Sequence, residues 1–167
     1  MIKKINFIFV TLFGVGKLSF APGTFASAIT AIVLFYFFHV IKISNETILL
    51  SLVIIFLYSF YGIKIYIEEK DNKDPKEVVI DEVIGQSIPL YLYEVSHGTN
   101  KEPYEALMYY IYIFILFRFF DIKKPFPVNF FDKRYKNNVG VILDDVVAGL
   151  YTVITLVIFM VVKSKFF

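Results

Sequence analysis

Four apolar segments, each about as long as the hydrocarbon core of a bilayer is thick, limit how this chain can fold. They comprise residues 24–43, 47–67, 104–120 and 146–162. Hydrophobic residues make up 57% of the chain, more than the roughly 45–50% usual in soluble domains. Because a helix satisfies its own backbone hydrogen bonds in lipid, these segments predict an all-α membrane bundle with about four long spanning helices. We expect residues 1–167 to form a single membrane-embedded domain.

A fifth, shorter apolar segment, residues 83–93, lies between the second and third long ones. Gln86, Ser87 and Pro89 interrupt it. The segment is too short and too polar to face lipid on all sides, so we expect a short helix inside the bundle or a half-spanning helix. The sequence leaves open whether this segment fully crosses the bilayer.

Basic residues are distributed unevenly over the connections between these segments. If all five segments cross in alternation, eleven basic residues lie on one face and four on the other. The first group is Lys3, Lys4, Lys17, Lys70, Lys73, Lys76, Lys123, Lys124, Lys133, Arg134 and Lys136, and the second is Lys42, Lys101, Lys163 and Lys165. Because cytoplasmic loops of membrane proteins are enriched in lysine and arginine, the first face is predicted to be cytoplasmic.

The composition excludes several kinds of site. The chain has no cysteine, which excludes disulfides, thiolate metal sites and a cysteine nucleophile. A formal charge of +2 without a basic stripe gives no indication of nucleic-acid binding. His39 and His97 fall on the predicted far side of the membrane, so we expect them to be structural or incidental. The apolar stretch of residues 5–13 lacks a small-residue cleavage site, and we expect it to be retained.

Five acidic residues stand directly beside apolar segments on the predicted cytoplasmic face: Asp81, Glu82, Asp121, Asp144 and Asp145. An ionised carboxylate near hydrocarbon is costly unless it is paired or bound to a cation. Clustered carboxylates without histidine or cysteine favour Mg²⁺, or Mn²⁺, over zinc. We therefore predict that these five residues form a metal-binding centre for Mg²⁺. The acids of polar linkers are expected to be solvated or paired with lysines: Asp71, Asp74, Glu94, Glu102 and Asp132.

Two basic residues adjoin the predicted acidic centre. Arg118 lies one helical turn before Asp121 and shares its helix face. Lys124 precedes Pro125, which biases the lysine out of a helical conformation. A lysine held in this way could bind a phosphate as a point charge.

A glycine-rich loop precedes the first long apolar segment. It contains Gly-Val-Gly-Lys, ending at Lys17, and Ala-Pro-Gly-Thr, ending at Thr24. We expect a tight turn there, with Thr24 as the candidate N-cap of the following helix. Free N–H groups at a helix start can bind a phosphate, although the spacing of a P-loop is absent.

Together these blocks resemble the phosphatidylglycerophosphatase A family of bacterial membrane lipid phosphatases. The resemblance runs from Phe13 to the last apolar segment. It is carried by residues 14–17 (Gly-Val-Gly-Lys), 21–27 (Ala-Pro-Gly-Thr-Phe-Ala-Ser), 79–86 (Val-Ile-Asp-Glu-Val-Ile-Gly-Gln), 118–127 (Arg-Phe-Phe-Asp-Ile-Lys-Lys-Pro-Phe-Pro) and 140–149 (Gly-Val-Ile-Leu-Asp-Asp-Val-Val-Ala-Gly). The Asp-Glu, Phe-Asp-x-x-Lys-Pro and Leu-Asp-Asp blocks in this order are specific when taken together.

The resemblance implies Mg²⁺-dependent hydrolysis of phosphatidylglycerophosphate to phosphatidylglycerol and phosphate, a step of phospholipid biosynthesis. It also implies a site at the cytoplasmic face of the bacterial inner membrane. Carried over by motif, the catalytic residues are Asp81, Glu82, Asp121, Asp144, Asp145 and Lys124, with the five acids also binding metal. The implied substrate-binding residues are Arg118, Lys17, Pro22, Gly23, Thr24 and Ser27.

The mechanism that we expect is in-line attack on phosphorus by a water that a spare carboxylate orients. Lys124 and Arg118 would stabilise negative charge on the transferred oxygens. An aspartyl-phosphate intermediate is an alternative, because the sequence does not separate a nucleophilic aspartate from a metal-binding one.

Two other kinds of protein also place acids in a membrane. Phosphotransferases that use CDP-linked donors resemble one another through Asp-x-x-Asp-Gly-x-x-Ala-Arg, and Asp-Val-Val-Ala-Gly at residues 145–149 lacks that spacing and the arginine. A divalent-cation or proton carrier would need acids near mid-membrane that are reachable from both sides. The acids of this chain lie at segment ends on one side, so a lipid phosphatase is the preferred interpretation.

Overall fold

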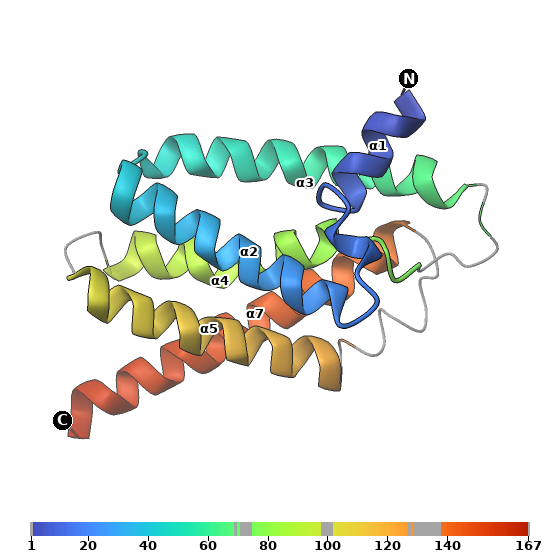
Figure 1. Cartoon of the computed structure of the whole chain (residues 1–167). Helices are drawn as coiled ribbons and strands as arrows, with labels where there is room; N and C mark the ends of the chain where they lie inside the picture. The colour runs from blue at the N-terminus through green and yellow to red at the C-terminus, as the bar shows by residue number, and fades with distance from the viewer. Residues whose placement is uncertain are drawn as a thin grey trace.

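The computed structural model describes residues 2–68, 70, 75–97, 102–126, 128 and 138–166, and the regular structure within them is entirely helical (Figure 1). The α-helices are α1 (Ile2–Val10), α2 (Pro22–Phe35), α3 (Asn45–Ile67), α4 (Ile80–His97), α5 (Pro103–Lys123) and α7 (Asn138–Phe166). A 3₁₀ turn, Val15–Lys17, precedes α2, and a π-helical turn, Tyr36–Ile41, extends it. The predicted all-α class is confirmed.

The long helices α2, α3, α4, α5 and α7 alternate in direction along the chain (Figure 1). Helices α2 and α5 are antiparallel neighbours, since Ser27 lies beside Arg118 and the ring of Phe35 contacts that of Tyr110. The starts of α2, α4 and α7 therefore share one end of the bundle with the ends of α3 and α5. We call this the site end and the opposite one the far end.

Three helices among the described residues are long and apolar enough to cross a membrane. They are α2 with its π turn (Pro22–Ile41), α3 (Asn45–Ile67) and most of α7 (Asn138–Lys165). In their apolar windows only 33%, 22% and 28% of the residues are buried, so most of their side chains face outward. Soluble monomers rarely expose apolar patches larger than roughly a few hundred Å². The protein is therefore a membrane protein with several apolar helices.

The fourth predicted span, residues 104–120, lies within α5 but is not one of these three candidates. Four of the 21 residues of α5 are tyrosines, and its last turns carry Arg118, Asp121 and Lys123. These polar groups lower its mean hydropathy below that of α2, α3 and α7, the three candidate spans. The count of four spanning helices stays a prediction.

Helix α4 is longer than the segment predicted at residues 83–93, because it runs for 18 residues, about 27 Å, from Ile80 to His97. Gln86 and Ser87 do not interrupt it; both are buried, and Ser87 Oγ donates a hydrogen bond to the Val83 carbonyl at 2.6 Å. The predicted bounds were wrong because polar side chains that are buried between helices do not end a helix.

At the far end, a buried polar contact joins the π turn after α2 to α4. His39 Nε2 lies 2.9 Å from Glu94 Oε1, and the two side chains are only 5% and 1% exposed. The prediction that Glu94 belongs to a polar linker was wrong, since α4 continues past it, whereas His39 has the structural role expected. Glu102 is exposed just before α5. The His97 side chain and the residues Asp71, Lys73, Asp74, Lys101, Asp132, Lys133, Arg134 and Lys136 lie outside the described part of the chain.

Candidate active site

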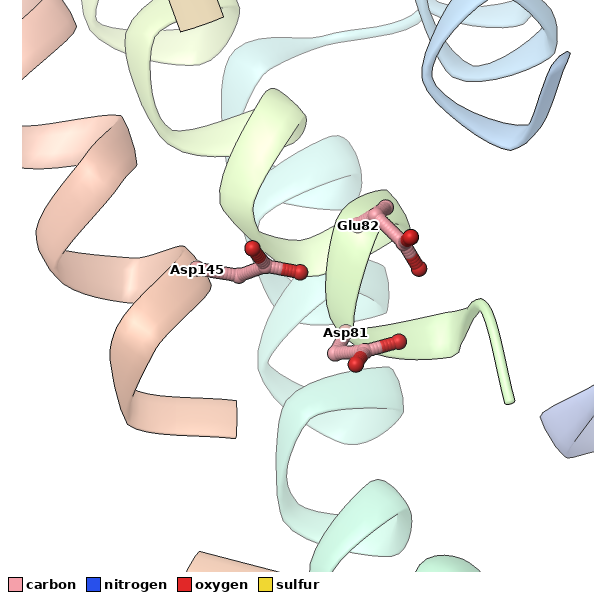
Figure 2. A group of neighbouring side chains, drawn as sticks. All are labelled: Asp81, Glu82 and Asp145. Atoms are coloured by element: carbon pink, nitrogen blue, oxygen red, sulfur yellow. The ribbon is translucent and has the colours of Figure 1, made fainter. Parts of the chain in front are cut away.

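Three carboxylates from two helices meet at the site end of the bundle. Asp81 and Glu82 lie in the first turn of α4, and Asp145 projects toward them from α7 (Figure 2). One oxygen of each carboxylate lies within 4.8 Å of the others. Asp81 and Asp145 are only 8% and 3% exposed, so the group is largely removed from water.

The other two predicted acids lie beside this cluster. Asp145 interacts electrostatically with Asp121 and Asp144 as well as with Asp81 and Glu82. The structure thus brings all five predicted carboxylates together, although Asp121 and Asp144 are not part of the group that lies within 4.8 Å.

Both predicted basic residues pair with acids of the centre. Arg118 forms an ion pair with Asp121 one turn further along α5. Lys124 Nζ donates to Asp144 Oδ2 at 2.7 Å. Lys124 follows the last residue of α5 and adopts a left-handed conformation with φ 43°, so the chain turns there as Pro125 predicts. This turn directs the ammonium from α5 to α7.

The donor set fits a hard divalent cation. Five carboxylates beside two basic side chains leave an excess of negative charge, and two like charges 4 Å apart repel by about 4 kcal/mol near a protein surface. Glu82 Oε2 is moreover buried without a hydrogen-bond partner among the described residues. Oxygen ligands of this kind are those that Mg²⁺ and Ca²⁺ prefer. Asp81, Glu82 and Asp145 could therefore hold a metal ion.

The start of α2 forms the wall opposite Glu82. Helix α2 begins at Pro22 with Ala21 as its N-cap, and the Thr24 amide donates to the Ala21 carbonyl at 3.0 Å. The prediction of Thr24 as the N-cap was wrong because proline at the first helical position is already set in a helical conformation. Gly23 faces the cluster, and a Cβ there would clash with Glu82 Oε1.

Ser27 continues this wall and connects it to α5. Its hydroxyl donates to the Gly23 carbonyl at 2.9 Å, and Arg118 Nη1 lies 3.5 Å from the Ser27 oxygen. The structure therefore brings Gly23, Ser27 and Arg118 to the carboxylates. Lys17 is placed differently, because its exposed ammonium lies 4.6 Å from the centre of the Phe7 ring of α1.

The segment that leads into α4 is fixed by Glu77. Its carboxylate accepts a hydrogen bond from the Tyr66 hydroxyl at 3.0 Å and pairs with Lys70. The hydrogen bond from Lys70 lowers the pKa of Glu77, which favours the ionised form. Gly16 packs on the Glu77 backbone so closely that a Cβ would clash with its carbonyl. The glycine-rich loop is thereby anchored beside the first turn of α4.

Gln86 is a candidate residue that our sequence-based site did not include. It lies one turn after Glu82 on the same face of α4 and is fully buried. Neither Oε1 nor Nε2 has a hydrogen-bond partner among the described residues. A polar residue inside an apolar segment was the available signal, because buried amides are normally hydrogen-bonded.

The fold and the site define a membrane protein with a buried carboxylate centre suited to a divalent cation. The chain belongs to the phosphatidylglycerophosphatase A family, whose model matches residues 8–160. It is thus a lipid phosphomonoesterase of that family, and its substrate is a phospholipid phosphate.

Individual relatives agree with this family but carry different names. A Bacteroides thetaiotaomicron protein with the provisional name phosphatidylinositol-3-phosphatase is 34% identical, over 93% of this chain and 96% of its own length. The phosphatidylglycerophosphatase A of Haemophilus influenzae is 31% identical, over 85% of this chain and 80% of its own. That of Escherichia coli is 34% identical over 46% of this chain and 40% of its own. No solved structure matches the chain.

Proposed function

We propose that this protein hydrolyses phosphatidylglycerophosphate to phosphatidylglycerol and inorganic phosphate, as a step of phospholipid biosynthesis, with Mg²⁺ as its cofactor. The observation that carries the proposal is the meeting of Asp81, Glu82 and Asp145 within 4.8 Å at one end of a membrane bundle. The family and its named relative from H. influenzae support this substrate.

Asp81, Glu82 and Asp145 would hold Mg²⁺, with Asp121 and Asp144 beside them. Bound there, Mg²⁺ would supply charge neutralisation at the phosphate oxygens and activation of water. The carboxylates provide hard oxygen ligands in a largely buried site, which suits this ion better than zinc.

The remaining chemistry is assigned to side chains of the chain itself. Arg118 and Lys124 bind the phosphate oxygens and stabilise charge that develops on them. A carboxylate that does not bind metal orients the attacking water and accepts its proton. The new bond joins the water oxygen to phosphorus, the bond between phosphorus and the glycerol oxygen breaks, and that oxygen takes up a proton to become the alcohol.

A second substrate is favoured by a specific observation. The B. thetaiotaomicron relative matches 93% of this chain, more than the H. influenzae protein does, and its name specifies phosphatidylinositol 3-phosphate. Both lipids carry a phosphomonoester on a polar headgroup, so the same carboxylates and basic side chains could act on either.

We further propose that the protein lies in the bacterial inner membrane with its site at the cytoplasmic face. Lys17, Lys70, Lys76, Lys123 and Lys124 lie at the site end, whereas Lys42, Lys163 and Lys165 lie at the far end. The positive-inside rule assigns the more basic end to the cytoplasm.

Phosphate release by the purified protein in lipid nanodiscs tests the activity. We expect release from phosphatidylglycerophosphate with Mg²⁺, none with a chelator, and weaker release from phosphatidylinositol 3-phosphate and phosphatidic acid. Asp81→Asn should abolish release. Glu105→Gln, which removes an exposed carboxylate of α5, should not.

Each arm has a result that would contradict its part of the proposal. Release unaffected by chelator removes the metal from the mechanism. Faster release from phosphatidylinositol 3-phosphate replaces the proposed substrate with the second one. No release from any of the three lipids excludes the phosphatase activity.

A further inference from the structure

A groove of about 320 Å³ between α2 and α5 opens on the outer surface of the bundle. Its walls include Ala28, Ala31 and Phe35 of α2 and Leu107, Ile111 and Phe114 of α5. We propose that this groove binds one acyl chain of the lipid whose phosphate lies at the carboxylate centre. The inference rests on the proposed lipid phosphatase function and names the feature that would hold the apolar part of the substrate.

On α2, the groove and the site share one stripe of the helix. Thr24, Ala28, Ala31 and Phe35 follow one another at intervals of four, three and four residues, which places them on a single helix face. Thr24 lies in the first turn of α2, next to Gly23, which faces Glu82. The stripe is therefore polar at the site end of the bundle and apolar toward the far end.

On α5, the same arrangement runs in the opposite chain direction. Arg118, Phe114, Ile111 and Leu107 are spaced by four, three and four residues and share one face. Arg118 is the residue that contacts Ser27 of α2, so the two stripes meet at their polar ends. If the phosphate of a lipid lies at Arg118, this apolar groove extends from the phosphate toward the far end of the bundle.

Two alanines create the room, and a ring contact closes the groove. Ala28 and Ala31 carry only a methyl group where α2 faces α5. At the end of the groove that is nearer the far end of the bundle, the rings of Phe35 and Tyr110 meet edge to face, with their centres 5.3 Å apart. From Ala28 to Phe35 the helix rises about 10 Å, so the groove accommodates the upper part of an acyl chain rather than a whole one.

Two other apolar hollows lie on the wrong side of α4 for this role. They measure about 360 and 240 Å³, adjoin α3, and are both lined by Val83 and Ser87. At 100° per residue, these two residues point about 170° away from the mean direction of Asp81 and Glu82. A chain seated under α3 would thus be separated from the carboxylates by the body of α4.

Filling the groove tests the proposal. Ala31→Leu should raise KM for a dioleoyl lipid phosphate by roughly tenfold, while KM for its dibutanoyl analogue should change by less than about twofold. Ser51→Leu is the matched control, because it adds the same side chain to an exposed position in the 240 Å³ hollow. It should alter neither KM. Ala28→Leu repeats the test at a second position in case Ala31→Leu does not fold.

The opposite results overturn the inference. One is an equal loss of activity on long-chain and short-chain lipids in both alanine variants. The other is a rise in KM for the dioleoyl lipid in Ser51→Leu that equals the rise in the alanine variants.

Photolabelling by phosphatidic acid with a diazirine in one acyl chain supplies a readout independent of turnover. Labels on α2 and α5 that Ala31→Leu reduces support the groove, and labels confined to α3 exclude it. A wild-type protein that is labelled there but releases no phosphate from any lipid refutes the proposed function and leaves the groove standing.

Discussion

Gly23 lies so close to Glu82 that a side chain at this position would displace the carboxylate. A Cβ there would meet the end of a flexible side chain rather than backbone, so Gly23→Ala should change the position of Glu82 more than the stability of α2. Since a displacement of about 1 Å in a catalytic group can cost roughly a hundredfold in rate, we expect a loss of phosphate release of that order. Release assays and thermal unfolding in detergent measure the two effects separately.

Gly62→Ala is the matched control for this substitution. Gly62 is a buried residue of α3, and a Cβ there would lie 3.4 Å from the nearest atom, on Phe9, which is an ordinary contact. The control should retain full activity. If both variants lose activity alike, or if Gly23→Ala remains active, the contact with Glu82 has no catalytic importance.

The acids outside the closest group should be as necessary as those within it. Asp121→Asn and Asp144→Asn keep the side-chain shape but remove the charge that pairs with Arg118 and Lys124 respectively. We expect each to lower phosphate release by at least roughly a hundredfold while the fold is retained. Glu46→Gln, at the exposed start of α3, is the control. Near-normal turnover in either aspartate variant would remove that residue from the mechanism.

Residues of the site could be predicted from the sequence where a charged side chain stands beside an apolar segment. Asp81, Asp121 and Asp144 stand out because ionised groups beside apolar segments need a partner. Gly23 enters the predicted site only through the family resemblance, because its close approach to Glu82 depends on the distance between α2 and α4, which no local pattern specifies. Gln86 was signalled only by its polarity within an apolar segment, and its full burial is seen only in the structure.

Helices α4 and α7 approach each other closely at Gly85 and Gly149. A Cβ on Gly149 would lie 2.6 Å from the Gly85 carbonyl oxygen, which is backbone and has no room to move away. Gly149→Ala should therefore lower the free energy of unfolding by about 1–3 kcal/mol. Gly62→Ala should leave it unchanged or raise it, because alanine favours a helix by about 1 kcal/mol over glycine. Unfolding in detergent measures both, and equal stability of the two variants would contradict the close packing.

The contact between the π turn and α4 should matter for stability and little for catalysis. Removing His39 leaves Glu94 buried without its partner, so His39→Phe should cost about 2–5 kcal/mol in unfolding free energy. The double variant His39→Phe, Glu94→Leu should recover much of this loss. Phosphate release per folded molecule should be retained, since the pair lies at the far end. A folded single variant without activity would show that the pair acts on the site.

A helix end could be predicted from the sequence where a proline after the helix restricts the backbone. Pro125 predicts the end of α5, and the chain turns at Lys124 as expected. The start of α2 differs because Pro22 accepts the first helical position, and Thr24 then becomes an interior residue. The length of α4 depends on burial of Gln86 and Glu94 against neighbouring helices, and that information lies outside the segment.

For the whole molecule, the order of long helices follows from hydropathy, but their number across the membrane does not. Apolar length identifies α2, α3 and α7 as candidate spans. Helix α4 runs from the site end to the far end, although its polar residues conceal this in the sequence (Figure 1). Because α4 runs the length of the bundle, Lys17 before α2, Lys76 before α4 and Lys124 after α5 lie at the same end.

Cysteine labelling tests whether α4 crosses the bilayer. The chain has no cysteine, so a single introduced one reports its own position. Phe20, 81% exposed, precedes α2, and Tyr104, 71% exposed, follows α4. Three passes separate the two positions if α4 crosses, and two separate them if it does not. We expect an impermeant maleimide to label Phe20→Cys in inverted vesicles and Tyr104→Cys in right-side-out ones. Labelling of both from the same side would make α4 a re-entrant helix, and the reverse pattern would place the carboxylate centre outside the cell.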